Sequence, residues 1–225
     1  SLLYLIIPGI LSAIFLYFFV PKMPEKDCYV KENFFFIMKE ILKNKVCMIL
    51  MFISVVKSAV SISFGTYIPF LLKNHGFNLE LTGLIVTLFF ISGGIATIVS
   101  SKIEKYINAN GVVVLSFLSI LPLTLGFLYT IKTYKTLACV LFILTGFFIL
   151  LSVGVILVQA QKTMPKYTGV ISGVMQGFSW GLGALFLAPL GILGQNYGVE
   201  KILILMSSIA FIVGIFTLKN KYLKD

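Results

Sequence analysis

The chain has 225 residues, of which 59% are hydrophobic and 12% are charged, and its mean hydropathy is +1.04. Polar side chains this scarce could not cover the surface of a water-soluble domain, so the composition excludes one and predicts an integral membrane protein. The net charge of +10 comes from lysine, since the sequence contains no arginine. The lysines are concentrated in alternate loops, as described below. We therefore interpret the charge as a sign of membrane topology and expect no nucleic-acid partner.

Seven apolar segments reach, or nearly reach, the length that crosses a bilayer. In chain order they are residues 2–20, 46–72, 81–101, 112–131, 136–158, 169–193 and 202–218. A helix rises about 1.5 Å per residue, and the hydrocarbon core is roughly 30 Å thick. A helix also satisfies its backbone hydrogen bonds within its own segment, as lipid requires. We therefore predict an all-α integral membrane protein with seven transmembrane helices.

The segments divide into three parts. Residues 1–20 open the chain inside an apolar run without a methionine, and we interpret them as the last helix of a truncated N-terminal half. Residues 21–45 form a polar linker that ends in apolar residues at helical spacing, which predicts a short helix lying on the membrane interface. Those apolar residues are Phe34, Phe35, Met38, Ile41 and Leu42. Residues 46–225 then form a six-helix bundle, which could be two inverted groups of three helices.

Lysines are concentrated in alternate loops. The lysine-rich set consists of residues 21–45, 102–111, 159–168 and the tail from 219. The other loops hold Lys73, Lys132, Lys135 and Lys201. Because lysine is enriched on the cytoplasmic side, we expect the linker and the C-terminus to be cytoplasmic in a multi-pass protein of the plasma or inner membrane.

The second apolar segment contains a lysine near the middle of the membrane. Lys57 stands about 16 Å into this segment, where an ammonium group is costly and rarely faces lipid. Ser54, Ser58 and Ser61 lie three residues before it and one and four residues after it, which gives the helix a polar stripe. One interpretation is a substrate or coupling site. The alternative is an ion pair with an acidic residue outside this chain.

Two further sets of polar residues occur in the later segments. Thr145, Ser152 and Gln159 recur every seven residues and so share one helix face. They could line a cavity, or their side chains could bond to backbone carbonyls and neighbouring helices. Gln176 and Trp180 lie four residues apart and could face the same cavity, although the tryptophan could equally be a packing residue.

Glycine recurs every four residues in the sixth segment, at Gly169, Gly173, Gly177 and Gly181, and Gly183 follows. Each glycine costs about 1 kcal/mol relative to alanine in a helix. Close approach of another backbone can offset this cost. The ladder is therefore either a static helix-packing surface or a surface that slides during transport. Gly93 and Gly94 in the third segment could act in the same way.

Three motifs together resemble the major facilitator superfamily, and within it the drug-efflux subgroup typified by fosmidomycin-resistance proteins. The subgroup pattern of the eleventh helix is matched by Gln161, Pro165, Gly169, Ser172, Gly173, Gly177, Gly181 and Gly183. Lys57 precedes Pro69 by twelve residues, as a basic residue does in the seventh helix of the subgroup. The cytoplasmic loop SKIEKYINANG (101–111) resembles the G-x-x-x-D-R-x-G-R-R loop, with Glu104 and Lys105 in place of Asp and Arg.

The resemblance implies that the chain is the sixth to twelfth helices of a twelve-helix transporter, with residues 46–225 as its C-terminal half-bundle. It implies that the seventh and tenth helices line a central cavity, and that the transporter exports a small anionic or amphipathic compound, such as a phosphonate-like antibiotic, in exchange for protons. The implied partners are the lipid bilayer, the substrate, protons and an N-terminal six-helix half that carries the coupling acid. The alternatives are an uptake permease for an organic anion or sugar, and an inactive fragment or partner half.

Other functional classes lack their signatures in this sequence. There is no phosphate-binding loop, and no cysteine or carboxylate cluster has the spacing of metal ligands. No nucleophile has a candidate base nearby, and the one histidine, His75, lies in a predicted loop. We therefore expect neither an enzyme nor a bound cofactor or metal.

Overall fold

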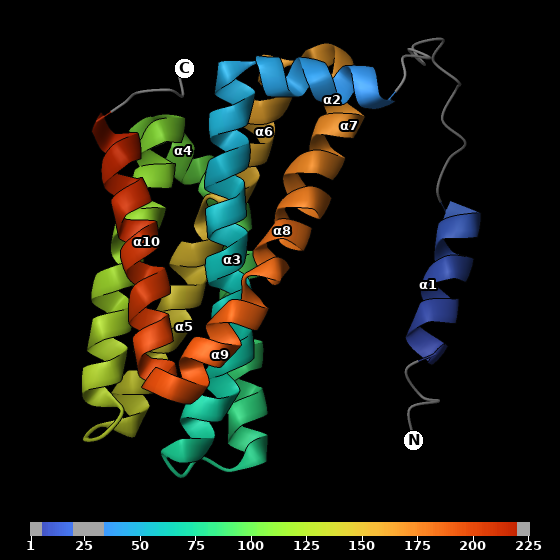
Figure 1. The fold of residues 1–225 in the computed structure, drawn as a ribbon. Helices are drawn as coiled ribbons and strands as arrows, with labels where there is room; N and C mark the ends of the chain where they lie inside the picture. Colours follow the sequence, from blue (N-terminus) through green and yellow to red (C-terminus); the bar gives the residue numbers. More distant parts are fainter. Residues whose placement is uncertain (1–5, 20–33, 220–225) are drawn as a thin grey trace. The chain divides into compact units, whose positions relative to one another are not determined.

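The computed structural model describes residues 6–19 and 34–219, and within them every regular element is a helix (Figure 1). Helix α1 (Ile6–Phe19) is apolar and belongs to a unit of its own, which ends at residue 34. Much of the predicted linker lies outside the described residues. The second unit contains five helical stretches long and apolar enough to cross a membrane. These are Lys45–Asn74, Leu79–Thr130, Lys135–Thr163, Pro165–Tyr197 and Val199–Lys219.

Helix α2 (Phe34–Lys43) occupies the end of the linker. It buries Ile37 and Ile41, whereas Phe35 is 78% exposed and Leu42 is also exposed. The face through Ile37 and Ile41 packs within the bundle, and the position of this helix on the membrane interface stays a prediction. Asn44 ends this helix and begins the next, because its side-chain Oδ1 accepts hydrogen bonds from the backbone N–H groups of Val46 and Cys47, at 3.1 and 3.2 Å.

Helix α3 (Lys45–Asn74) is followed by a short turn and by α4 (Leu79–Thr130). At 52 residues α4 would be roughly 78 Å long if straight, far longer than a bilayer core. Instead the chain turns back at Asn108 (Figure 1), where φ is +57° and the Oδ1 atom accepts a hydrogen bond from the Gly111 N–H at 3.1 Å. The two predicted segments are thus confirmed, but the predicted loop 102–111 is wrong, since one residue makes the turn.

Helices α5 (Lys135–Leu151) and α6 (Val153–Thr163) together form one span, broken at Ser152. The next span is composite. It contains a 3₁₀ turn η2 (Pro165–Tyr167), α7 (Thr168–Gly173), a π-helical turn η3 (Val174–Phe178), α8 (Ser179–Leu185) and α9 (Leu187–Tyr197). Gly198, with φ of +90°, leads into α10 (Val199–Lys219). Counting α4 twice, six segments cross the membrane between residues 45 and 219, as the sequence predicted.

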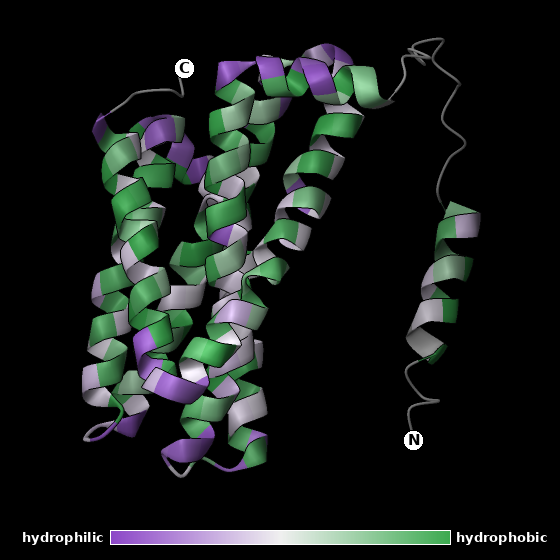
Figure 2. Cartoon of the chain, in the orientation of Figure 1, coloured by the Kyte–Doolittle hydropathy of each residue, from purple (hydrophilic) through white to green (hydrophobic). Residues whose placement is uncertain are grey.

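The bundle is held together by apolar contacts between neighbouring spans. Helix α4 packs against α5, α6 and α10, and α3 packs against α8 and α10. Between α4 and α5, the rings of Phe89 and Phe142 stack at a centroid distance of 4.7 Å. Figure 2 shows apolar residues along the length of the spans and hydrophilic residues gathered at their ends. This distribution is typical of a protein whose middle part is surrounded by the hydrocarbon core of a membrane.

Helix α8 lies close to α3 at Gly183. A Cβ atom at this position would lie 2.8 Å from the backbone nitrogen of Ala59 and 3.0 Å from the carbonyl carbon of Ser58. Among the residues that the structure describes, nothing lies within 4 Å of such an atom at the four ladder glycines, which are Gly169, Gly173, Gly177 and Gly181. Within the bundle, therefore, the backbone contact is made by Gly183 and not by the ladder.

Gly183→Ala and Gly181→Ala are a matched pair two residues apart on one helix. We expect Gly183→Ala to lower the free energy of unfolding by about 1–3 kcal/mol, because the methyl group meets rigid backbone. Gly181→Ala should change it by less than about 1 kcal/mol, and upward, because alanine favours the helix. Thermal unfolding of the detergent-solubilised protein measures both, and equal destabilisation would contradict the assignment of the contact to Gly183.

Candidate functional site

Lys57 lies in the middle of α3 and is 2% exposed. Its Nζ atom is placed over the ring of Trp180, 5.9 Å from the ring centroid, which is the geometry of a cation–π contact. Within residues 6–19 and 34–219, the contact between a carboxylate and a basic side chain joins Glu200 to the His75 ring, at 3.8 Å, and no carboxylate lies within 4.0 Å of Lys57. The tryptophan ring is thus the neighbour that stabilises this charge in the described part of the chain.

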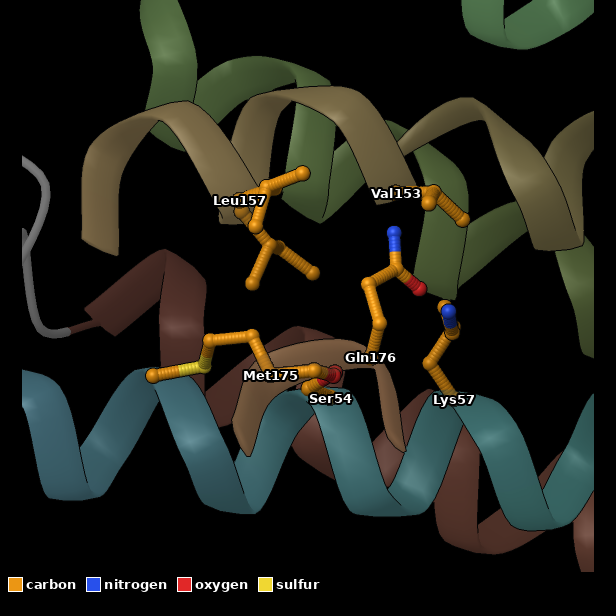
Figure 3. A pocket seen from close by; sticks show the side chains of 7 residues that line it. Ser54, Lys57, Val153, Leu157, Met175 and Gln176 are labelled. Carbon is orange, nitrogen blue, oxygen red and sulfur yellow. The ribbon is translucent and has the colours of Figure 1, made fainter. Parts of the chain in front are cut away.

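Lys57 borders a cavity enclosed by α3, α6 and the π turn η3 (Figure 3). The residues that line it are Ser54, Lys57, Val153, Ile156, Leu157, Met175 and Gln176. In Figure 3 the side chains of Lys57 and Gln176 extend from neighbouring elements towards Val153 on α6. The cavity volume is about 10 Å³, which is close to the space that one water molecule needs. The site is therefore a small hollow with mostly apolar walls and an ammonium group at its edge.

The π turn η3 places two of the lining residues, Met175 and Gln176. It is tied to α3 because the Ser54 Oγ donates a hydrogen bond to the Met175 carbonyl oxygen at 2.9 Å. Such turns insert one residue into a helix and occur frequently at functional sites. Sequence reasoning did not find this turn, nor the apolar lining residues Val153 and Ile156, because residues of these types are found throughout the chain.

The other serines near Lys57 are buried away from the cavity. Ser58 and Ser61 are fully buried, and their Oγ atoms have no hydrogen-bond partner among the described residues. The Oγ atom of Ser179 on α8 is also buried and has no hydrogen-bond partner among the described residues. Of the predicted polar stripe on α3, the structure brings Ser54 to the hollow beside Lys57 and leaves Ser61 outside it.

The predicted stripe on the fifth span faces α4 and its own backbone. Thr145 donates to the Leu141 carbonyl at 2.8 Å, and Ser152 accepts from the Ser116 Oγ at 3.1 Å. Gln159 donates through Nε2 to Glu104 Oε1 at 3.2 Å. None of these three residues lines the cavity, whose wall on this span is the apolar face of α6.

The residues of the glycine-containing pattern and of the cytoplasmic loop motif also make contacts within the bundle. Gln161 Nε2 and the Ser172 Oγ, both part of the glycine-containing pattern, form a hydrogen bond at 2.7 Å that links α6 to α7. In the cytoplasmic loop motif Glu104 bonds to Gln159, whereas Lys105 is exposed. A Cβ atom at Gly93 would overlap the Leu150 side chain of α5, and the space beside Gly94 is open.

Two comparisons with known proteins agree with one another. A family model described as Major Facilitator Superfamily matches residues 1–188. The Fosmidomycin resistance protein of Escherichia coli (strain K12) is 27% identical over 166 residues. The matched stretch covers 73% of this chain and 39% of that protein. The chain therefore spans well under half of the length of this relative.

Replacing Lys57 with methionine should stabilise the bundle. Methionine keeps the length of the side chain and removes an ammonium group whose cost at a helix centre is about 2.5–3.5 kcal/mol, while the cation–π contact that is lost supplies about 0.5–2 kcal/mol. We expect a net gain of about 1–2 kcal/mol in the free energy of unfolding, measured by chemical or thermal unfolding in detergent.

Lys73→Met is the control for this substitution. Lys73 is an exposed lysine in the last turn of the same helix, so its replacement should leave the free energy of unfolding nearly unchanged. Loss of stability in Lys57→Met would show that the surroundings of Lys57 stabilise the ammonium group by more than its burial costs, and would contradict the expected net gain.

Proposed function

The chain belongs to the major facilitator superfamily, and we propose that it forms the C-terminal part of a secondary active transporter that exports a small anionic or amphipathic compound. The members of this family are multi-pass membrane transporters, so the family membership favours transport over catalysis. The observation that carries the proposed substrate class is the buried ammonium group of Lys57, which lies beside a small hollow and has no carboxylate within 4.0 Å among the described residues.

The chemistry of the hollow favours an organic anion. A charge in a low-dielectric interior is costly unless a group of opposite charge compensates it, so a bound anion would gain from Lys57. The Trp180 ring offers an apolar face, and the Gln176 amide can both donate and accept a hydrogen bond. These groups together suit a compound with an anionic end and an apolar body. The name of the relative, a resistance protein for a drug, supports drug export as the function.

The hollow is too small to hold such a compound by itself. Small-molecule sites usually measure about 300–1,000 Å³, whereas this cavity measures about 10 Å³. We propose that Ser54, Lys57, Gln176 and Trp180 form one wall of the substrate path and that an N-terminal six-helix half forms the other. In this arrangement residues 1–20 are the last helix of that half, residues 21–45 are the cytoplasmic linker with α2 on the membrane interface, and residues 46–225 are the second half.

Alternating access would then be a rocking of the two halves about this path. The open face at Gly169, Gly173, Gly177 and Gly181 supports such an arrangement, because small residues let another helix come close and slide past. Gly94 on α4 has the same open surroundings. Gly93 and Gly183 already contact neighbours within the bundle, so we assign them to packing.

We propose proton exchange as the energy source. The described acidic residues lie at span ends or in loops, so the coupling acid would belong to the N-terminal half. The sorting of lysines supports a plasma or inner membrane location with the linker and C-terminus in the cytoplasm.

Cells that express the gene for this chain should accumulate less of an anionic drug than cells without it, and Lys57→Ala should abolish the difference. The reason is that alanine removes the charge that the anion would pair with. Uptake of radiolabelled fosmidomycin measures the effect, with Lys73→Ala as a control at an exposed position. Higher accumulation that depends on Lys57 would indicate an uptake permease, and no dependence on expression would favour an inactive or partner half.

Leucine at Gly173 or Gly177 should reduce this transport at least tenfold while the bundle unfolds at the same temperature within about 2 °C, since within the described residues these positions face open space. Gly83→Leu is the control, because Gly83 on α4 is equally open but lies outside the ladder. Full transport in the ladder variants would exclude a close helix contact at this face.

A further inference from the structure

A second hollow lies between α9 and α10, close to the turn that joins them. It is a groove of about 240 Å³ lined by Leu193, Tyr197, Lys201, Ile202 and Leu205. Ile202 forms its floor, since it is 2% exposed. The two helices touch at this point, because a Cβ atom at Gly194 would lie 2.5 Å from the Ile202 Cδ1 atom. The groove therefore has a closed base between two tightly packed helices.

The sides of the groove are open and apolar. Leu193 and Leu205 are 40% and 44% exposed, and they stand on opposite helices. Farther along α10, exposed Ile209 and Ile212 continue the apolar surface. Where such a surface faces the membrane it is covered by acyl chains, and the groove would then be a recess in a lipid-facing surface.

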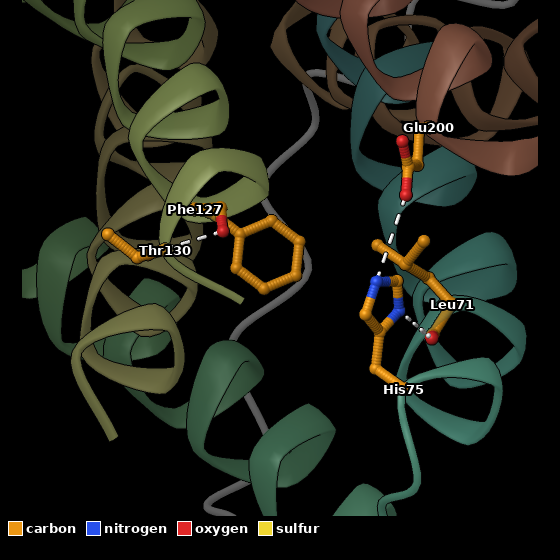
Figure 4. A network of polar contacts seen from close by, with 5 residues as sticks. All are labelled: Leu71, His75, Phe127, Thr130 and Glu200. Carbon is orange, nitrogen blue, oxygen red and sulfur yellow. Dashed lines mark hydrogen bonds and ion pairs between the residues drawn. The ribbon is translucent and has the colours of Figure 1, made fainter. Parts of the chain in front are cut away.

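A single positive charge stands at the groove. The Lys201 Nζ atom lies over the Tyr197 ring, 5.5 Å from its centroid. The acidic neighbour Glu200 is turned away, towards His75 in the turn after α3, with an Nε2–Oε1 distance of 3.8 Å (Figure 4). Within residues 6–19 and 34–219, no carboxylate lies within 4.0 Å of Lys201. The charge of Lys201 is thus available to an external anion.

The position of Lys201 within its helix matches the depth of lipid phosphate groups. It is the third residue of α10, at the end of a span. Lysine and tyrosine gather at this level of a membrane because their apolar stems contact the acyl region while their polar ends reach the headgroups. We propose that the groove binds one phospholipid with an anionic headgroup, with its phosphate on Lys201 and an acyl chain between Leu193 and Leu205 over Ile202.

The charge favours an anionic lipid over a partner helix as the occupant. A helix packed into this groove would cover Lys201 with apolar side chains and leave its charge uncompensated, whereas a phosphate compensates it. The volume is below the about 300–1,000 Å³ of ordinary small-molecule sites and suits part of an acyl chain. The proposal depends on the chain spanning a membrane and does not depend on the transported substrate.

The test is native mass spectrometry of the purified protein with added phosphatidylglycerol or phosphatidylcholine. We expect phosphatidylglycerol to bind in preference, and Lys201→Gln to weaken its binding about fivefold, which is the effect of one interfacial lysine. Lys132→Gln is the matched control. Lys132 is an exposed lysine in the loop after α4 and does not line the groove, so its replacement should leave lipid binding unchanged. Leu205→Trp should fill the groove and displace the lipid while Lys201 is intact.

Three results would overturn the proposal. Equal weakening by Lys201→Gln and Lys132→Gln would indicate diffuse attraction between the protein and anionic lipid. Equal binding of the two lipids by the unmodified protein would remove the role of the headgroup charge. A change in oligomeric mass in Leu205→Trp, with lipid occupancy unchanged, would show that protein covers the groove. Thermal unfolding without added lipid confirms that each variant is folded before its binding is compared.

Discussion

The hydrocarbon interior of a membrane offers no hydrogen-bond partner, and at several points where a helix bends or ends a side chain of the protein supplies one. Asn44 and Asn108 supply side-chain oxygens where the backbone changes direction, so that each break leaves fewer free N–H groups. At the π turn of the sixth segment the Ser54 hydroxyl donates a hydrogen bond to the Met175 carbonyl oxygen. The irregular backbone is thus held by side chains from within the protein.

The same constraint makes Lys57 exceptional. Most polar side chains in the spans donate to carbonyls of their own helix, as Thr145 does, or to a neighbouring helix, as Ser116 does. Lys57 has neither kind of contact in the described residues and is placed beside the Trp180 ring at the edge of a hollow. A charge kept in such a position at a cost in stability is characteristic of a functional residue in a membrane protein.

The glycines show how one residue type serves two purposes in a single span. Gly183 brings α8 against the backbone of α3 and fixes the position of the hollow beside Lys57. The ladder from Gly169 to Gly181 runs along a face that has open space in the described residues. Gly181 and Gly183 both lie on α8, and a helix turns by about 100° per residue, so the glycine that meets α3 points away from the face that carries Gly181. A transporter with these features would have a fixed inner wall and a separate face for movement.

The sequence by itself determined the membrane setting, the number and order of the crossing segments in residues 45–219 and the buried position of Lys57, because hydropathy and the cost of a charge in lipid depend on residue type alone. It could not give the single-residue turn at Asn108, because Asn44 and Asn78 make the same kind of hydrogen bond where they begin helices. It could not give the π turn either, because the hydrogen bond that ties this turn comes from Ser54 on another helix. It also could not separate polar residues that line the hollow, such as Gln176, from those that bond helices together, such as Ser152, because both kinds look alike along one helix. Only the packing of α3, α6 and η3 against one another decided which side chains share a cavity, since that depends on the rotation of each helix about its axis.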